Sequence, residues 1–584
     1  MAEPAASHLP TFAKLKKNCA SSAEGLPHYR LALLGDSATQ HLATALRGCG
    51  VEHRLALDLY ESDYDQVRAE VLDPASGLYA FCPDAVLLYL CTEKLYARFA
   101  ALPEDGRTGF AEAVFAEIEG YWSAISAQCE AKILQYTFVC ADDDVFGDYA
   151  LKVAQSFPRQ LARLNLLLAE GCTAHKNVFL ADLAGLQARM GRAQFYDPTF
   201  YYLARMPISL AALPAAADCV LRLIDAFLGR VRKCVVLDLD NTLWGGVIGD
   251  DGLGGIQIGE LGVGRAYTDL QLWLRELRRR GVLLAVCSKN DPETAREPFE
   301  KHPDMVLRLA DISLFVANWD DKVTNLRLIQ KTLNIGMDSL VFLDDNPFER
   351  EAVRALLPEI CVPELPEDPA HYLEYLRSLD LFATASYSEA DRVRTQQYRE
   401  EAGREQAQQQ FANYDDYLAS LDMQAFAGPF DAFHFPRIAQ LTQRSNQFNL
   451  RTVRYTEDEV AALAADPAVH TLYFTLSDRF GDYGLIGVAV LRPLDAESLF
   501  VDTWLMSCRV LRRGMEEFIA DKIVAAAAAA GCHRVVGEYL PTAKNKMVEH
   551  LYEQMGFTAL GGGRFAAECD RYQSHKTNIK EKTV

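Results

Sequence analysis

One short stretch, residues 233–246, constrains the fold of this chain more than any other. Four apolar or small residues precede two carboxylates, Asp238 and Asp240, and a tryptophan and two glycines follow shortly after them. A short apolar run is typical of a buried parallel strand, and ligands of open α/β sheets bind where such strands end. Two adjacent carboxylates repel each other, so a bound hard cation is the natural compensation. The stretch predicts a parallel sheet with a metal site at its edge; a merely solvated acidic turn is the alternative.

The length and the charge of the chain limit its organisation and its partners. A chain of 584 residues should hold about three to five domains. The formal net charge of −21 argues against nucleic acid and anionic membranes as main partners. The first 17 residues lack the apolar core of a secretory signal, and no uncharged apolar run is long enough to span a membrane. The 14 cysteines form no CxxC pairs, so we expect a cytoplasmic protein without a zinc or disulfide framework.

The first third of the chain predicts an α/β domain over residues 1–215. Its apolar strand candidates, which alternate with helical stretches, are 30–37, 84–90, 131–139 and 177–182. Residues 35–37, a Gly-Asp-Ser triplet, resemble the nucleophile block of the SGNH hydrolases. That family also needs an Asp-x-x-His pair, which neither Asp182 nor Asp197 provides. A serine without its base is a poor nucleophile, so we expect an SGNH-like, non-hydrolytic domain with Ser37 as a relic or a binding residue.

Three more strand candidates in the central third end in polar residues. They are 282–290, ending in Ser-Lys-Asn, 313–322, leading to a lysine at a helix start, and 339–350, ending in two aspartates. Together with residues 233–246, these pieces resemble, in this order, the haloacid dehalogenase superfamily of phosphohydrolases. The resemblance implies a Rossmann-like core over residues 230–375. Solvated strand tips without a shared site are the alternative, which four ordered coincidences disfavour.

The resemblance also assigns roles to residues and a cofactor. Asp238 would accept the phosphoryl group, and Asp240 would act as the general acid and base. The implied phosphate-binding residues are Thr242, Ser288, Lys289, Asn290 and Lys322. Mg²⁺ would be held by Asp238, Asp240 (through its carbonyl), Asp344 and Asp345. These residue types suit phosphoryl transfer, which mostly needs positioning and neutralisation of charge.

The spacing between the central motifs leaves no room for a lid domain. Neither the segment from Thr242 to Ala266 nor that from Ser288 to Lys322 is long enough for one. By this resemblance, a haloacid dehalogenase enzyme without a large lid has an open active site, as do the members that act on macromolecules. A protein-borne substrate is therefore favoured over a free metabolite acting alone.

The last third predicts an exposed helical linker over residues 376–420 and an α+β domain over 421–584. Its strands, a helix after Arg512-Arg513-Gly514 and a Tyr…Gly-Phe ending resemble the GCN5-related N-acetyltransferases. The start of that helix could hold a pyrophosphate through free backbone amides. The expected carrier-binding or pantetheine-binding residues are Cys508, Arg509, Arg512, Arg513, Gly514 and Asn545. An inert copy of the fold is the alternative. The chain as a whole is thus expected to be a three-domain α/β protein.

Four segments together resemble the FkbH-like proteins. They are 238–246, 343–347, 437–450 and 506–514. This resemblance implies an enzyme that takes a small phosphorylated three-carbon substrate, 1,3-bisphosphoglycerate. It would remove phosphate and load a glyceryl group as a thioester onto the phosphopantetheine arm of an acyl carrier protein in polyketide-type biosynthesis.

The acyl phosphate is already activated, so a thiolate could attack it without ATP. We expect Cys287, beside Ser288, to hold the glyceryl group, with Cys508 as the second candidate. A buried core residue is the commoner fate of cysteine and is the alternative for Cys287. Two other functions remain open. One is a magnesium-dependent phosphatase or phosphotransferase without acyl transfer, and the other is a docking protein with an inactive site.

Overall fold

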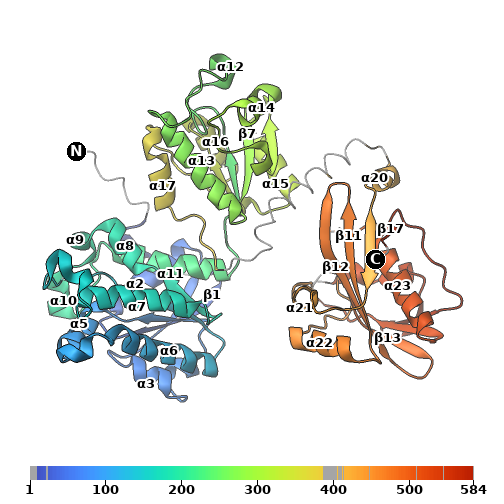
Figure 1. Ribbon diagram of the computed structural model, residues 1–584, viewed down its shortest axis with the longest axis horizontal. Helices are drawn as coiled ribbons and strands as arrows, with labels where there is room; N and C mark the ends of the chain where they lie inside the picture. The colour runs from blue at the N-terminus through green and yellow to red at the C-terminus, as the bar shows by residue number, and fades with distance from the viewer. Residues whose placement is uncertain are drawn as a thin grey trace. The chain divides into compact units, whose positions relative to one another are not determined.

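The computed structural model describes residues 9–20, 24–141, 143–385, 404, 411, 413–445, 448–507, 510–542 and 545–582. The chain divides into two compact units. Figure 1 labels the helices and strands of both units. The first joins Met1–Lys233 to His371–Ser388, and the second joins Cys234–Ala370 to Glu389–Val584. The expected α/β class with three sheet-containing parts is confirmed.

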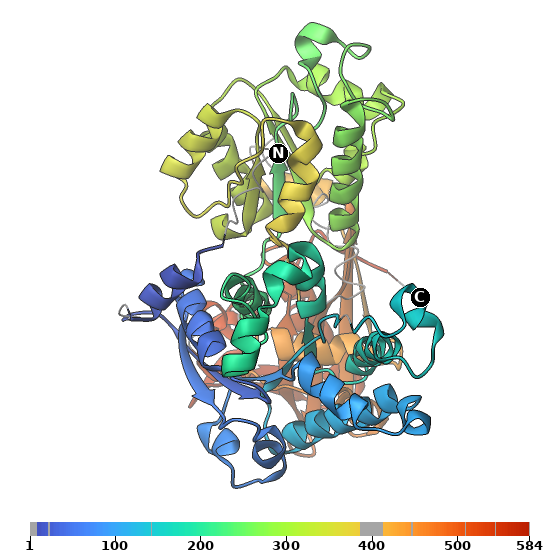
Figure 2. The ribbon, with the colours of Figure 1, turned by 90° about the vertical axis from the view of Figure 1, so that its left-hand side faces the viewer.

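The first unit is built on a five-stranded parallel sheet (Figure 2). Its strands, in spatial order, are β2 (Ala56–Glu61), β1 (His28–Gly35), β3 (Ala85–Tyr89), β4 (Lys132–Tyr136) and β5 (Val178–Ala181). Helices α2 (Gln40–Glu52) and α11 (Leu213–Phe227) pack in the core on one face. Helices α6 (Phe110–Gln128) and α7 (Phe157–Cys172) pack on the other. The sheet is therefore buried on both faces, as continuous apolar strands require.

The central sheet has four parallel strands, whose apolar residues are almost all buried. In spatial order they are β8 (Leu314–Ala317), β7 (Leu283–Ser288), β6 (Cys234–Leu237) and β9 (Leu340–Leu343). The helices that follow them in the chain are α13 (Gly264–Arg279), α14 (Pro292–Lys301), α15 (Lys322–Leu333) and α16 (Pro347–Leu356). Between β6 and α13 the structure holds only the four-residue helix α12 (Ile248–Asp251). No lid domain interrupts this region, as its length had predicted.

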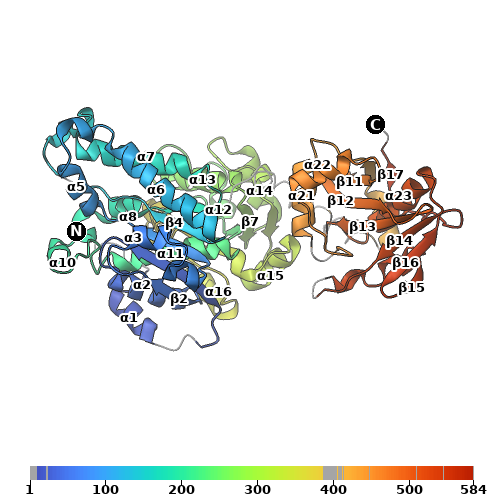
Figure 3. The ribbon, with the colours of Figure 1, turned by 90° about the horizontal axis from the view of Figure 1, so that it is seen from below.

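The C-terminal part contains an eight-stranded sheet (Figure 3). In spatial order the strands are β15 (Thr558–Gly561), β16 (Arg564–Glu568), β14 (Arg534–Glu538), β13 (Ser498–Met506), β12 (Gly481–Pro493), β11 (His470–Asp478), β10 (Gln424–Gly428) and β17 (Lys580–Glu581). Most neighbours are antiparallel, but β13 and β14 run parallel and are joined by α23 (Met515–Ala529). Helix α23 packs on one face of the sheet, and α21 (Phe435–Arg444) and α22 (Glu457–Ala465) pack on the other.

The expected linker over residues 376–420 falls largely outside the described residues. Its beginning lies in helix α17 (Tyr372–Ser378), which belongs to the first unit, and its end is helix α20 (Tyr414–Ser420). Among the described helices, none has the length and apolar character needed to cross a membrane.

Candidate active site

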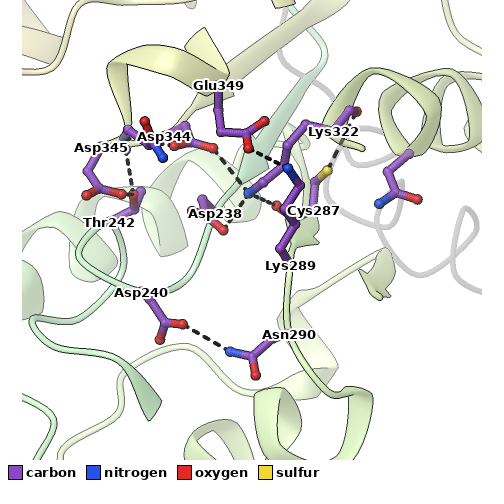
Figure 4. A network of polar contacts seen from close by, with 12 residues as sticks. Asp238, Asp240, Thr242, Cys287, Lys289, Asn290, Lys322, Asp344, Asp345 and Glu349 are labelled. Atoms are coloured by element: carbon purple, nitrogen blue, oxygen red, sulfur yellow. Dashed lines mark hydrogen bonds and ion pairs between the residues drawn. The ribbon is translucent and has the colours of Figure 1, made fainter. Parts of the chain in front are cut away.

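Polar side chains from all four strand ends of the central sheet meet at one edge (Figure 4). Asp238 follows β6, Ser288 ends β7 and Asp344 follows β9. Lys322 begins α15, the helix after β8. Parallel strands present their carboxyl ends on the same edge, which is why residues distant in the sequence converge here.

Lys322 lies at the centre of this group, with only 3% of its surface exposed. Its Nζ is 2.7 Å from Oδ1 of Asp238 and 3.1 Å from Oδ2 of Asp344. It also donates a hydrogen bond to the carbonyl of Cys287 at 2.8 Å. Burial opposes the charge, but the two carboxylates outweigh it and raise the pKa of Lys322, so the ammonium stays protonated.

Three carboxylates form a group that fits a divalent cation. One oxygen from each of Asp238, Asp344 and Asp345 lies within 4.8 Å of the others. Burial, followed by the charge of Asp238, raises the pKa of Asp344 and of Asp345. Carboxylates that lie close together and away from solvent shift in this way, because each disfavours the charge of the others. Oδ2 of Asp344 lies near Lys322 but accepts no hydrogen bond among the described residues. A hard cation with oxygen ligands would relieve this crowding, so the donor set suits Mg²⁺.

Thr242 supports this group rather than facing an open phosphate site. Its side chain is fully buried. Its hydroxyl accepts a hydrogen bond from the backbone N–H of Asp345 at 3.0 Å and lies 3.3 Å from Oδ1 of the same residue. The geometry therefore gives Thr242 a contact that positions Asp345, and its expected contact with phosphate stays a prediction.

Asp240 points away from the three-carboxylate group (Figure 4). Its Oδ1 accepts hydrogen bonds from Nε1 of Trp244 at 2.9 Å and from the N–H of Ile248 at 3.0 Å. Its Oδ2 accepts one from Nδ2 of Asn290 at 3.0 Å. Burial raises the pKa of Asp240 despite these donors. A carboxyl group with a raised pKa, two residues after the nucleophile candidate, is suited to proton transfer. Asn290 orients this carboxyl group, and its expected contact with phosphate stays a prediction.

Lys289 and Ser288 occupy different depths at the end of β7. Ser288 is buried, whereas the Lys289 side chain is partly exposed and its Nζ lies 2.5 Å from Oε1 of Glu349. Glu349 comes from α16, after β9, so this ion pair reaches across the site edge (Figure 4). Glu349 carried no sequence signal, because only the fold brings it next to Lys289.

The structure places Cys287 beneath the site and not within it. The side chain is fully buried in the central core, and its Sγ lies 4.0 Å from the carbonyl of Lys322. Burial raises the pKa of this thiol to about 12. The thiolate is the reactive form of cysteine. The geometry therefore argues against the expected role of Cys287 as holder of a glyceryl group.

The expected pantetheine-binding residues of the C-terminal part are mostly engaged in the fold. Arg513 is buried and hydrogen-bonds the Tyr483 hydroxyl. Asn545 is fully buried and donates to the carbonyls of Asn449 and Leu540, each at 2.9 Å. These contacts give both residues a structural role. Cys508 and Arg509 lie outside the described residues.

A carboxylate from the first turn of α23 already lies at the start of this helix. Gly514 precedes the helix with a φ of +89°, and a Cβ there would lie 3.4 Å from Thr577 of the C-terminal segment. Glu516 accepts a hydrogen bond from the backbone N–H of Arg512 at 2.8 Å. A carboxylate in the first turn competes with a bound pyrophosphate for the same donors.

Residues 448–450 fill the gap where β13 and β14 separate. The two strands pair only over residues 498–500 and 534–536. Beyond that point the N–H of Leu450 donates to Trp504 and that of Met506 to Phe448, while Leu540 donates to Leu450. The chain itself thus satisfies backbone groups that the separating strands leave unpaired.

In the first unit, Asp182 and Asp197, neither of which is followed by the histidine of an SGNH-type pair, act as helix caps. Asp182 accepts a hydrogen bond from the N–H of Gly185 at the start of α8 (Leu183–Met190). Asp197 accepts from Thr199 and Phe200 at the start of α10 (Pro198–Ala204). Ser37 is buried. Both aspartates thus have a local capping role, and the non-hydrolytic character of this domain stays a prediction.

Comparisons with known proteins agree with this architecture. The family model described as "FkbH, N-terminal domain" matches residues 30–225. The solved N-terminal part of the protein BF1531 from Bacteroides fragilis, described as containing a phosphatase domain complexed with Mg, is 44% identical. That match covers 65% of this chain and 100% of that one, with a TM-score of 0.62.

Two acetyltransferase structures also match part of the chain. The ribosomal-protein-S18-alanine N-acetyltransferase from Escherichia coli is 14% identical over 25% of this chain and 94% of its own, with a TM-score of 0.20. The spermidine N-acetyltransferase from Vibrio cholerae is 16% identical over 26% and 98%, with a TM-score of 0.21. None of the curated proteins compared with the chain matches it.

The central fold and its convergent acidic edge, with the 44% identity to a phosphatase-containing protein, define an enzyme of the haloacid dehalogenase type. Within that class, the chain belongs to the FkbH-like proteins.

Proposed function

We propose that this protein takes 1,3-bisphosphoglycerate, removes phosphate and loads the glyceryl group as a thioester onto an acyl carrier protein. The contact of Asp238 with the buried ammonium of Lys322 supports the first part of this proposal, the removal of phosphate. The FkbH-like membership supports the acyl-transfer half. Because the thiol of Cys287 is fully buried, the proposal takes the carrier's own thiol as the direct acceptor.

Acyl transfer needs little from the protein beyond alignment. The carrier's sulfur attacks the C1 carbonyl of the acyl phosphate, a carbon–sulfur bond forms, and the carbon–oxygen bond to phosphate breaks. The departing phosphate takes the thiol proton. No ATP is required, because the acyl phosphate is already activated.

Removal of the C3 phosphate is assigned to the central site. A carboxylate oxygen of Asp238 attacks phosphorus while Lys322 neutralises the phosphoryl oxygens. Asp240 gives its proton to the departing C3 oxygen, then takes a proton from the water that hydrolyses the aspartyl phosphate. Mg²⁺, which Asp238, Asp344 and Asp345 would hold, neutralises phosphoryl charge when bound. The magnesium in the Bacteroides fragilis relative supports this choice of metal.

One assay tests the whole proposal. The purified chain is incubated with 1,3-bisphosphoglycerate, magnesium and a holo-carrier, and the carrier is read by intact mass. A glyceryl adduct is the expected result. Phosphate release without any carrier adduct would instead indicate a phosphatase or phosphotransferase without acyl transfer, and neither product would indicate a docking protein.

Metal binding has a separate readout. Mg²⁺ should raise the melting temperature of the chain, because a ligand that binds only the folded state stabilises it. An Asp345→Asn variant should show a smaller rise. An unchanged melting temperature in the wild-type chain at millimolar Mg²⁺ would contradict the metal site.

A further inference from the structure

Arg350 is a buried charged residue beside the three-carboxylate group, and the proposed chemistry does not use it. It lies on α16, and only 4% of its surface is exposed. An arginine is seldom buried so completely unless its guanidinium group is paired. The partners of Arg350 therefore indicate what this residue does.

The Nη1 of Arg350 bridges two successive carbonyl groups. It donates a hydrogen bond to the carbonyl of Asp344 at 2.8 Å and to that of Asp345 at 2.6 Å. Both residues follow β9, whose pairing with β6 ends at Leu343, and no backbone N–H of the described residues donates to either carbonyl. A carbonyl group that leaves a sheet inside a protein needs another donor. Arg350 supplies that donor where the candidate metal ligands begin.

The peptide group between Asp344 and Asp345 is held at both of its ends. Arg350 binds its carbonyl oxygen, and the hydroxyl of Thr242 accepts a hydrogen bond from its N–H at 3.0 Å. The carbonyl and the N–H of a planar trans peptide point in opposite directions. Two contacts on opposite sides therefore fix the plane of this peptide, and with it the directions in which the side chains of Asp344 and Asp345 leave the backbone.

We propose that Arg350 is a positioning residue for the metal ion. By holding the peptide between Asp344 and Asp345, it fixes how their carboxylates are oriented relative to each other and thereby sets the affinity for Mg²⁺. Mg²⁺ demands near-ideal octahedral geometry, so a rotation of this peptide would weaken its binding. The inference rests on the metal site of the proposed function and adds to that site a residue that the metal itself does not touch.

Arg350 also makes a contact that only stabilises the fold, and the chain offers a control for it. Its Nη2 donates to Glu364. Arg354, one turn further along α16, donates to Glu364 at 2.5 Å and to the carbonyl of Val362 at 3.0 Å. Arg354 therefore shares the helix, the charge and the acidic partner of Arg350. None of its hydrogen bonds within the described part of the chain goes to the carbonyls of the two aspartates.

The test measures Mg²⁺ binding directly, by calorimetric titration of MgCl₂ into the full-length chain without substrate. Arg350→Met removes both carbonyl contacts and should raise the dissociation constant of Mg²⁺ about tenfold to hundredfold, as loss of a residue that orients metal ligands does. Arg350→Lys keeps a charge and a donor without the planar fork and should cause a smaller increase. Arg354→Met and Glu364→Gln should bind Mg²⁺ as the wild type does.

Two results would overturn the inference. One is a wild-type dissociation constant in Arg350→Met. The other is an equal increase in Arg350→Met and Arg354→Met, because it would show that α16 as a whole had loosened. Circular dichroism reports whether each variant folds. If Arg350→Met does not fold, the folded Arg350→Lys variant takes its place, and a wild-type dissociation constant there would overturn the inference equally.

The Mg²⁺ dependence of the rate gives a second readout, which a merely structural role would not produce. With p-nitrophenyl phosphate as substrate, the Mg²⁺ concentration at half-maximal rate should rise about tenfold or more in Arg350→Met, while the rate at saturating Mg²⁺ stays close to that of the wild type. A lower maximal rate with an unchanged Mg²⁺ requirement would overturn the positioning role. Absence of Mg²⁺ binding in the wild-type chain would refute the metal site of the proposed function itself.

Discussion

The ammonium of Lys322 contacts the Oδ1 of Asp238 at 2.7 Å. The proposed nucleophile and the proposed neutralising cation are thus paired inside the protein, where a charge without a partner is costly. This pairing makes Lys322 important for stability as well as for chemistry, and the two effects can be separated.

Replacement of Lys322 by methionine should leave Asp238 and Asp344 as unpaired, partly or fully buried carboxylates. We expect a loss of about 3–5 kcal/mol in the free energy of unfolding, as for other broken buried pairs. Phosphate release should fall by about 10²–10³, the usual cost of one charge-stabilising group. Chemical denaturation and a phosphate assay check both. Lys331→Met, on the exposed side of the same helix, is the control and should match the wild type.

The effect of Asp240→Asn should depend on the leaving group. An alkyl phosphate needs a proton on its departing oxygen, whereas p-nitrophenolate leaves readily without one. We expect the rate of the first step to fall by about 10²–10⁴ for alkyl phosphates, the usual contribution of a general acid, and far less for p-nitrophenyl phosphate. Burst kinetics measure that step. Equal losses on both substrates would contradict the acid role.

Trp244→Phe should shift the pH profile in a defined direction. The indole N–H donates to Asp240 and stabilises its ionised form, so its removal should raise the pKa of Asp240 further. Activity that needs the protonated acid should then persist to higher pH than in the wild type. A profile that moves to lower pH, or does not move, would argue against Asp240 as the acid.

Cys287→Ala should retain carrier loading within a few-fold of the wild type. The thiol is fully buried, and burial raises its pKa to about 12. Iodoacetamide should modify the exposed Cys82 and Cys140 of the folded chain but not Cys287, as peptide mass analysis would show. A glyceryl adduct on Cys287 would restore the role first expected from the sequence.

His53 should make the first unit less stable at alkaline pH. Its Nδ1 lies 2.6 Å from Asp225 and its Nε2 lies 2.9 Å from Asp218. Burial opposes its charge, but these carboxylates raise its pKa to about 12. Because the folded pKa is raised, this stabilisation is complete below the unfolded value near 6.5 and is lost as pH rises towards 12.

Hydrogen exchange of peptides that cover residues 40–61 measures this effect in the whole chain. In the wild type, the protection of these amides against exchange should decline from about pH 7 upwards, by more than the intrinsic rise of the exchange rate with pH explains. The His53→Gln variant should show a smaller decline. His28→Gln is the control, since His28 and its partner Asp58 lie on the surface. An identical decline in all three proteins would contradict the prediction.

The sequence was most informative where the chain encodes its structure locally. Apolar runs that end in Asp238, Ser288 and Asp344 predicted three strands and the edge where they meet, because burial of a parallel strand dictates such runs. The lysine at the start of α15 was equally visible. By contrast, β2 was not predicted, since its partly exposed, alternating residues lack a continuous apolar run.

Contacts between distant segments could not be predicted in the same way. The bonds from Trp244 and Asn290 to Asp240, and the pairing of Lys289 with Glu349, depend on how strand ends are arranged in space. The burial of Asn545 and Cys287 likewise follows from packing rather than from residue type. Sequence patterns thus predicted the residues that meet at the sheet edge better than the residues that orient them.

Residues 371–385 belong to the first unit, so the central sheet is an insertion in the chain. Asp380 from this segment pairs with Arg189 and Arg222, at 3.5 and 3.2 Å. A fragment that stops at residue 233 would therefore lose α17 and leave both arginines without this partner. A shortened protein should therefore end after residue 385. It then keeps both segments that join the first sheet to the central one, at residue 233 and at residue 371.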